Sequence, residues 1–295
     1  MSARRAASYL LVAPVWVLLG AFFLAPHAVM LATSFRERGL YGGVRPIDDV
    51  AGYVASGAFL GNYARTLDPL YAAIFVRSFW MAALTTLLCL AASFPVAYYV
   101  AILAGPRSKG PMLAAIVVPF WSSFLIRTYA WVLILRTEGL ANRALMALGI
   151  VSEPLPLLYS NTAVMIGLVY GELPFMILPL YASLEKLDLG LLEAARDLGA
   201  TAWQAFWRVT VPVTAPGIAA GVVLVFVPSV GQFVVSDLLG GGKTILLGSL
   251  VQNQFVVARN RPFGSAVAFE LAAIVLALLL AYAVWAKRRG HEALL

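Results

Sequence analysis

Six long apolar stretches dominate this sequence. They cover approximately residues 9–34, 72–103, 112–135, 161–183, 213–238 and 265–286. A helix of about 20 mostly apolar residues crosses the roughly 30 Å hydrocarbon layer of a bilayer, and it satisfies its own backbone polar groups there. The sequence therefore predicts an all-α, polytopic membrane protein with six transmembrane helices, in which residues 1–295 form a single transmembrane domain.

Composition agrees with a lipid solvent and argues against nucleic acid as a partner. The chain is 62% hydrophobic and 12% charged, whereas soluble domains are nearer half apolar and about a quarter charged. The formal charge is +7. Because much of the Arg and Lys flanks the apolar stretches, we interpret it as topology signals and headgroup anchors.

Residues for bond chemistry are scarce. Cys89 is the only cysteine and lies in an apolar stretch, so a disulfide or CxxC metal site cannot form within the chain. His27 and His291 are the only histidines, and neither has a partner at metal-ligand or triad spacing. We expect no catalytic residues and no metal site.

The distribution of cations predicts the orientation. Six spans place both termini on one side, and the first span is too long for a signal-peptide core, so it is interpreted as a retained helix. The cations on the side of the termini are concentrated in short segments: Arg4, Arg5, Arg107, Lys109, Lys186, Arg196, Arg208, Lys287, Arg288 and Arg289. Those on the other side are diluted over longer loops, approximately 35–71, 136–160 and 239–264. Density favours termini in the cytoplasm.

The connection over about residues 185–212 is predicted to contain two short helices. Asp188 is placed to cap the first helix at its start, and Gly199 to close it at its end. Thr201 and Gln204 have capping-box spacing for the second helix, and Pro212 is expected to stop it before the next span. The apolar anchors expected in the second helix are Trp203, Phe206 and Trp207.

The first of these helices has the features of a docking element. Ala194 and Ala195 present little side chain, so another protein can approach closely, while Glu193 and Arg196 offer charges for orientation. The alternative interpretation is an amphipathic helix lying on lipid headgroups.

A resemblance favours docking. Glu193-Ala194-Ala195, then Gly199, then Val209-Thr210-Val211-Pro212 resembles the EAA loop of binding-protein-dependent ABC importer permeases, although Val209 and Val211 stand where that family usually has Ile and Leu. The resemblance implies the type I ABC importer permease fold, with the loop inserted into a cytoplasmic ATPase. It assigns ATPase coupling to Glu193, Ala194, Ala195, Asp197, Gly199 and Ala200.

Further motifs are similar to the spermidine/putrescine-type permeases. They are Val118 to Arg127, Leu173 to Tyr181, Phe226 to Ser229 with Asp237 to Gly241, and Arg261 to Gly264. The likeness implies a bacterial inner-membrane complex with a second, homologous permease, a homodimeric ATPase and an external substrate-binding protein. The chain itself has no complete nucleotide-binding motif, so ATP and Mg²⁺ are expected on the ATPase. Iron, thiamine and phosphonate importers have related permeases, and they remain alternatives.

Charged groups at membrane depth are costly, so they are functional candidates. Glu172 lies near the middle of the fourth apolar stretch, two residues before Pro174, where a carboxylate facing a cavity would attract a cationic polyamine. The alternatives are a structural pair with Arg127 or a buried protonated acid. A secondary transporter or channel that uses Glu172 and Arg127 as a relay is the rival function, and it leaves the EAA loop unexplained.

Aromatic and polar residues on the third and fifth apolar stretches extend this predicted path, because aromatic faces and carboxylates suit alkylammonium ions. They are Trp121, Tyr129, Gln232, Phe233 and Asp237. For the aromatic residues, packing or an interfacial belt is the competing role. Asp237 fits the outer mouth, where contact with the binding protein is an equal alternative.

Overall fold

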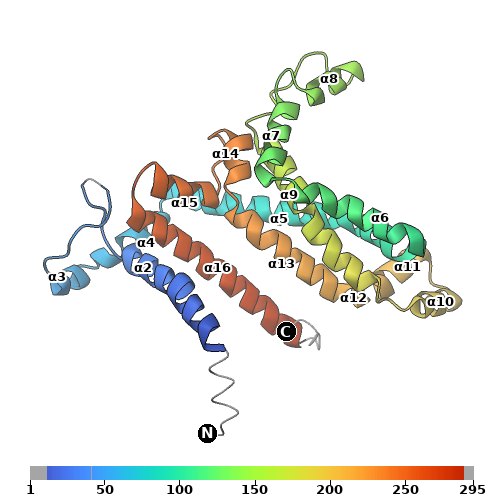
Figure 1. The fold of residues 1–295 in the computed structure, drawn as a ribbon, viewed down its shortest axis with the longest axis horizontal. Coiled ribbons are helices and arrows are strands. Elements are labelled where there is room, and N and C mark those ends of the chain that lie inside the picture. Colours follow the sequence, from blue (N-terminus) through green and yellow to red (C-terminus); the bar gives the residue numbers. More distant parts are fainter. Residues whose placement is uncertain (1–11, 41, 289–295) are drawn as a thin grey trace, which may run out of the picture. The chain divides into compact units, whose positions relative to one another are not determined.

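The computed structural model describes residues 12–40 and 42–288, with side chains up to residue 284, and this part of the chain is helical without a β-strand (Figure 1). Arg4, Arg5, Arg289 and His291 lie outside the described residues, as does the beginning of the predicted first span. The α-helices are α2 (Ala25–Ser34), α3 (Val50–Ala55), α4 (Gly61–Thr66), α5 (Pro69–Tyr98), α6 (Pro106–Val117), α7 (Phe124–Leu135), α8 (Leu140–Ala147), α9 (Asn161–Leu184), α10 (Leu189–Asp197), α11 (Ala202–Ala205), α12 (Val211–Val213), α13 (Ala215–Gly231), α14 (Val234–Gly240), α15 (Leu247–Val256) and α16 (Arg261–Arg288). Short 3₁₀ and π segments are η1 (Gly20–Leu24), η2 (Ala58–Leu60), η3 (Tyr99–Leu103), η4 (Val118–Trp121) and η5 (Phe206–Thr210).

The chain divides into two compact units, residues 1–73 with 250–274, and residues 74–249 with 275–295. In the first unit, the Thr66 hydroxyl donates to Glu270 Oε1 at 2.8 Å, which joins α4 to α16. The Arg65 guanidinium lies over the Phe263 ring, 4.6 Å from its centroid. The coupling and substrate-path residues predicted from the sequence all belong to the second unit.

Four described helices are long and apolar enough to cross a membrane: Val12–Ser34, Pro69–Leu103, Asn161–Leu184 and Arg261–Val284. Two further candidates are bent pairs, Pro106–Trp121 with Phe124–Ala147 at 90° and Ala202–Val213 with Ala215–Gly231 at 68°. The count reaches the predicted six if each bent pair is one span.

The packing of α5 on α9 supports counting the α6–α7 pair as one span. Thr85 Oγ1 donates to Met165 Sδ at 3.3 Å, Cys89 Sγ lies 3.6 Å from the Val169 carbonyl oxygen, and Ser93 Oγ lies 3.4 Å from that of Leu173. Each pair has the same sequence separation, 80, so the two helices run parallel. Parallel neighbours require an odd number of crossings between them.

Helix α13 runs antiparallel to α9 in close contact. Gly217 lies beside Pro179 and Ser183, and Gly221 lies beside Met176. Residue numbers therefore increase along one helix where they decrease along the other. The absence of a side chain at these glycines lets the backbones approach. The second to fifth spans therefore alternate in direction, as six crossings require.

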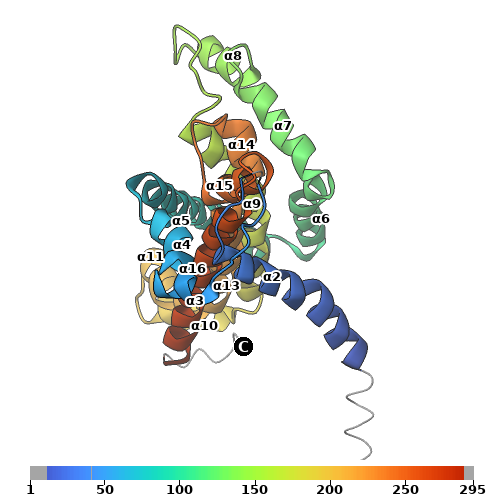
Figure 2. The same ribbon diagram turned by 90° about the vertical axis from the view of Figure 1, so that its left-hand side faces the viewer.

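The third span bends at Ser122 and Ser123, between η4 and α7 (Figure 2). Arg127 Nη1 donates to the carbonyls of Pro119 and Ser122 at 3.1 and 3.0 Å. The Pro119 carbonyl also accepts from the amide and the hydroxyl of Ser122, and carbonyl groups at a helix break must be satisfied within the protein at membrane depth. The guanidinium therefore supports the bend.

The fifth predicted span is also interrupted. The expectation that Pro212 stops the preceding helix is wrong, because the helix continues through the π segment η5 and α12, and it breaks at Thr214. The Thr214 hydroxyl donates to the Thr210 carbonyl at 2.7 Å there. A second break separates α13 from α14 at Gln232 and Phe233.

Close contact between α9 and α13 predicts that Gly217→Ala destabilises the protein. A Cβ at this position would lie 2.6 Å from the Pro179 carbonyl oxygen, and overpacking of this kind costs about 1–3 kcal/mol. Gly61→Ala is the matched control, since no atom lies within 4 Å of its added Cβ. Thermal unfolding of the purified protein in detergent should show a lower midpoint for Gly217→Ala alone. Equal midpoints for both variants would contradict the packing.

Candidate functional site

The connection between α9 and α13 is an ordered pair of short helices, as the sequence predicts. Asp188 Oδ1 accepts a hydrogen bond from the Gly190 amide at 2.9 Å and caps the start of α10. At the other end, the Ala200 amide donates to the Ala195 carbonyl at 3.0 Å, and Gly199 has a φ of +82°. This is a Schellman closure, in which glycine adopts the left-handed conformation without a steric cost.

The second helix begins with the predicted capping box. The Gln204 amide donates to Thr201 Oγ1 at 3.3 Å, and the Thr201 amide donates to Gln204 Oε1 at 3.0 Å. Of the three predicted aromatic anchors, Phe206 packs edge-on against Phe94, with ring centroids 5.1 Å apart. Trp203 is 69% exposed, and Trp207 is also more than half exposed, so the tryptophan rings extend beyond the chain's own core.

One face of α10 packs against the ends of neighbouring spans. Leu187, Leu192 and Ala205 form a buried cluster, against which Ile102 and Ala195 are packed. The ammonium group of Lys109, after the α5–α6 turn, lies 3.9 Å from the Glu185 carboxylate. The connection and the α5–α6 turn are therefore at the same end of the second unit, where the sequence predicts a concentration of cations.

The other face of α10 carries most of the predicted coupling residues. Glu193, Ala194, Asp197 and Gly199 are exposed, and Ala200 is half-buried. Ala195 differs from the expectation of an open alanine pair, because it packs on the chain's own cluster.

Three leucines of α10 and its C-terminal cap are also exposed, and no sequence motif above singles them out. Leu198 is 90% exposed, and Leu189 and Leu191 are about half exposed. The sequence does contain a signal for their exposure. The number of leucines between residues 187 and 198 exceeds the number that one buried face of a short helix can hold. Several exposed apolar side chains on one short helix are a candidate interaction site.

A cavity of about 500 Å³ lies between the α6–α7 bend and helices α9, α13 and α14. Its wall contains three phenylalanine rings, one carboxylate, one guanidinium and one amide. The lining residues are Phe120, Phe124, Arg127, Gly171, Glu172, Phe175, Leu224, Pro228, Gln232 and Val234.

Glu172 is 5% exposed, and its buried Oε2 has no hydrogen-bond partner. Among the residues with described side chains, no ion pair involves Glu172. The structural ion pair between Glu172 and Arg127, which the sequence left as an alternative, is therefore not formed. The Arg127 guanidinium instead binds two carbonyls and lies 4.4 Å from the centroid of the Phe120 ring.

The other predicted path residues divide into two groups. Gln232 joins Glu172 in the cavity wall. Trp121, which is 81% exposed, lies outside it, as do the exposed Tyr129, Phe233 and Asp237. The phenylalanines of the wall were missed, since only tertiary structure brings α7 and α9 together.

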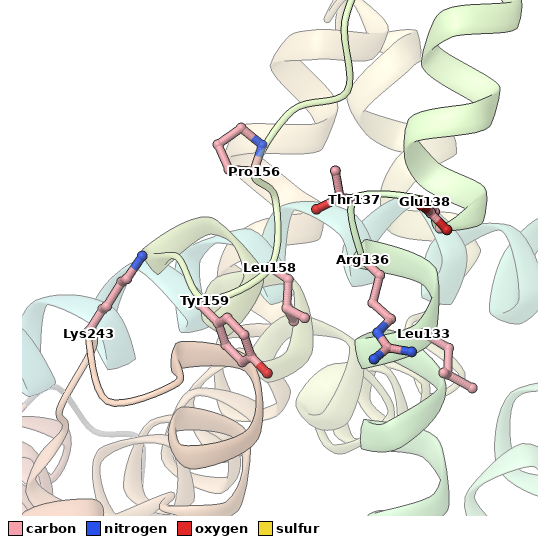
Figure 3. A pocket seen from close by; sticks show the side chains of 9 residues that line it. Leu133, Arg136, Thr137, Glu138, Pro156, Leu158, Tyr159 and Lys243 are labelled. Carbon is pink, nitrogen blue, oxygen red and sulfur yellow. The ribbon is translucent and has the colours of Figure 1, made fainter.

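A second cavity, of about 760 Å³, lies beyond the C-terminal end of α7 (Figure 3). It is lined by Arg136, Glu138, Tyr159 and Lys243 among others. Tyr159 has a φ of +60°, and its ring packs against Gly241, where a Cβ would collide with it. Since Tyr159 precedes the start of α9, this polar cavity is at the end of the second unit opposite to α10.

Comparisons with known proteins agree on one class. The model of the family described as "Binding-protein-dependent transport system inner membrane component" matches residues 5–289. The chain is 43% identical over 268 residues to the spermidine/putrescine transport system permease protein PotB of Salmonella typhimurium (strain SL1344), covering 90% of this chain and 88% of that protein. It is 42% identical to PotB of Escherichia coli (strain K12), covering 90% of this chain and 92% of that protein.

A solved structure supports the fold. The bacterial alginate ABC transporter in complex with an alginate pentasaccharide-bound periplasmic protein contains a chain that aligns with a TM-score of 0.76. The alignment covers 98% of this chain and 96% of that chain, at 16% identity. The expected ABC importer permease fold is confirmed.

The Schellman closure predicts a graded response at Gly199. Val disfavours a positive φ, so Gly199→Val should open the end of α10, whereas Asn tolerates this conformation, so Gly199→Asn should preserve it. Amide hydrogen exchange at Ala200, whose N–H is bonded to Ala195, should accelerate about tenfold or more in the Val variant, the equivalent of roughly 1–2 kcal/mol of strain. Unchanged exchange in the Val variant would contradict the assigned closure.

Proposed function

The chain belongs to the family of binding-protein-dependent transport system inner membrane components, and from this premise we propose that it is one permease subunit of an ATP-driven importer of polyamines of the spermidine/putrescine class. It is a multi-pass protein of the bacterial inner membrane. The substrate assignment is supported by relatives at 42–43% identity over nine-tenths of the chain.

The observation that carries the energy-coupling part of the proposal is the two-faced helix α10. One face is fixed by Leu192 to the ends of the spans. The opposite face presents Leu198, exposed to 90%, beside exposed charged residues. A separate ATPase needs such an element to move the spans, whereas the channel or secondary-transporter function does not account for it.

The proposed assembly contains four kinds of chain. A homodimeric ATPase in the cytoplasm holds ATP and Mg²⁺ and receives α10, a second homologous permease completes the pathway, and an external binding protein delivers the substrate. Both termini of this chain lie in the cytoplasm, on the side of α10. The chain makes and breaks no covalent bond of its substrate.

Contacts within the second unit provide a mechanical route. When the ATPase subunits close, a displacement of α10 is transmitted through Leu187 and Leu192 to Ile102 at the end of the second span. Helix α9 continues directly into this connection, and α13 is packed on α9 through Gly217 and Gly221. Movement of α10 thus reaches the helices that line the cavity.

Uptake by the reconstituted complex tests the function. Proteoliposomes containing both permeases and the ATPase, supplied with the binding protein, should accumulate labelled spermidine only with ATP on the ATPase side. Excess unlabelled putrescine should compete, whereas thiamine, phosphonate and ferric iron should not. ATP-independent uptake would support the secondary transporter, and competition by one of the other solutes instead would move the chain to another importer class.

The docking surface predicts a specific defect in a surface variant. Leu198→Asp should lower co-purification of the ATPase at least about tenfold, because a carboxylate replaces an apolar side chain at a desolvated interface. Leu148→Asp is the matched control, because Leu148 is also a highly exposed leucine, at 74%, and it follows α8 near the opposite end of the unit. Equal retention of the ATPase by both variants would contradict docking through this face.

A further inference from the structure

We infer that the cavity around Glu172 is a membrane-embedded site for an alkylammonium group, occupied by the transported polyamine on its way through the permease. This inference rests on the proposed import of polyamines and deepens it, because it assigns a defined location and recognition chemistry within this chain.

The carboxylate is the first reason. Glu172 is buried, its Oε2 has no hydrogen-bond partner, and it forms no ion pair with the residues that the structure describes. Leaving a buried acceptor without a partner costs free energy, and the cost is larger at membrane depth. An ammonium group that enters the cavity offsets this cost by supplying the missing donor and the opposite charge.

The surrounding groups leave Glu172 available. The groups facing the cavity from η4 and α7 are the rings of Phe120 and Phe124 and the guanidinium of Arg127, while α9 contributes Phe175. Helices α13 and α14 and the break between them add apolar side chains and the amide of Gln232. Arg127 is the only cation among the lining residues. Its Nη1 is bound to the carbonyls at the bend, its buried Nε has no hydrogen-bond partner, and it forms no ion pair with Glu172 among the described side chains.

The aromatic wall is the second reason. A cation within about 6 Å of a ring centroid is attracted by the ring's negative face. The cavity already shows this interaction, because the Arg127 carbon Cζ lies 4.4 Å from the Phe120 centroid and 6.0 Å from that of Phe124. Phe175 leaves a further ring for the methylene chain or the ammonium group of a ligand.

Size and exposure are the third reason. A cavity of about 500 Å³ falls within the usual range for small-molecule sites. Phe175 and Leu224 in its wall are about half exposed, so the cavity is open on one side of this chain. Because a carboxylate is too costly to face lipid, we assign the open side to the pathway shared with the second permease.

The experiment uses the complete reconstituted importer with its binding protein. Glu172→Gln keeps the size of the side chain and removes its charge, and Glu172→Asp keeps the charge on a shorter side chain. Glu270→Gln is the matched control, a carboxylate of α16 whose replacement can still accept from Thr66. For each variant, the KM and maximal rate of ATP-dependent spermidine uptake, the ATPase rate stimulated by the binding protein, and the thermal midpoint are measured.

The expected result is at least about a tenfold loss of uptake efficiency in Glu172→Gln, since a charge-assisted contact is worth about one factor of ten or more. Its thermal midpoint should equal or exceed that of the native protein, because an unpartnered buried charge is removed. ATPase stimulation should persist. Glu172→Asp should retain part of the uptake, and Glu270→Gln should behave as native.

A buried acid with a purely structural role predicts normal uptake by Glu172→Gln, and that result overturns the inference. If the Glu172→Gln variant fails to assemble into the complex, the Phe175→Leu variant tests the site instead. This substitution keeps an apolar side chain and removes the aromatic ring. A severalfold rise in KM for Phe175→Leu supports the site, and an unchanged KM overturns it. Absence of spermidine uptake by the native complex is a different outcome, because it removes the proposed substrate itself.

Discussion

Every backbone N–H and C=O group that enters the hydrocarbon layer needs a partner within the protein, and this requirement determines where the helices of this chain can be interrupted. At the bend of the third span, Arg127 donates to the carbonyls of Pro119 and Ser122. Before α13, the Thr214 hydroxyl donates to the Val211 carbonyl and to the Thr210 carbonyl, which also accepts from the Thr214 amide. The interruptions are thus stabilised by particular side chains, and the break at Gln232 contributes to the wall of the same cavity as the α6–α7 bend. The cavity is a consequence of interrupted helices.

Helix α9 connects the two candidate sites of the molecule. Near its middle it carries Glu172, and at its end Leu184 is buried just before the cluster that holds α10. Parallel packing on α5 and antiparallel packing on α13 fix α9 on two sides, with Gly217 and Gly221 allowing the closer of the two contacts. A helix held in this way moves with its neighbours as a unit. In the proposed import cycle, a displacement of α10 by the ATPase would therefore reach the cavity without a flexible link between the two sites.

Features set by neighbouring residues could be predicted from the sequence, whereas features set by tertiary packing could not. The apolar stretches, the Asp188 cap and the Gly199 closure depend on residues close together in the chain. The structure confirms the cap, the closure and four of the six stretches as single long helices, and the other two are bent pairs. The continuation of a helix through Pro212 depends on a π segment that no local rule predicts. Arg127 binds carbonyls at a bend that only the structure locates. For this reason the sequence could not show that Arg127 forms no ion pair with Glu172. The number of leucines indicates that some of them are exposed, but which ones depends on Leu192 occupying the buried face of α10.

The central claim is that α10 is held by an ATPase on the cytoplasmic side, and site-directed cross-linking tests it most directly. The native sequence suits this measurement because its one cysteine, Cys89, is buried. In Ala194→Cys, a short reagent that is thiol-reactive at one end and photoreactive at the other, applied to membranes, should link the exposed face of α10 to the nucleotide-hydrolysing chain, with a yield that changes when ATP is bound. The account is contradicted if an impermeant thiol reagent labels this cysteine from the outer side of intact cells, or if the cross-link forms only to lipid or to the external binding protein.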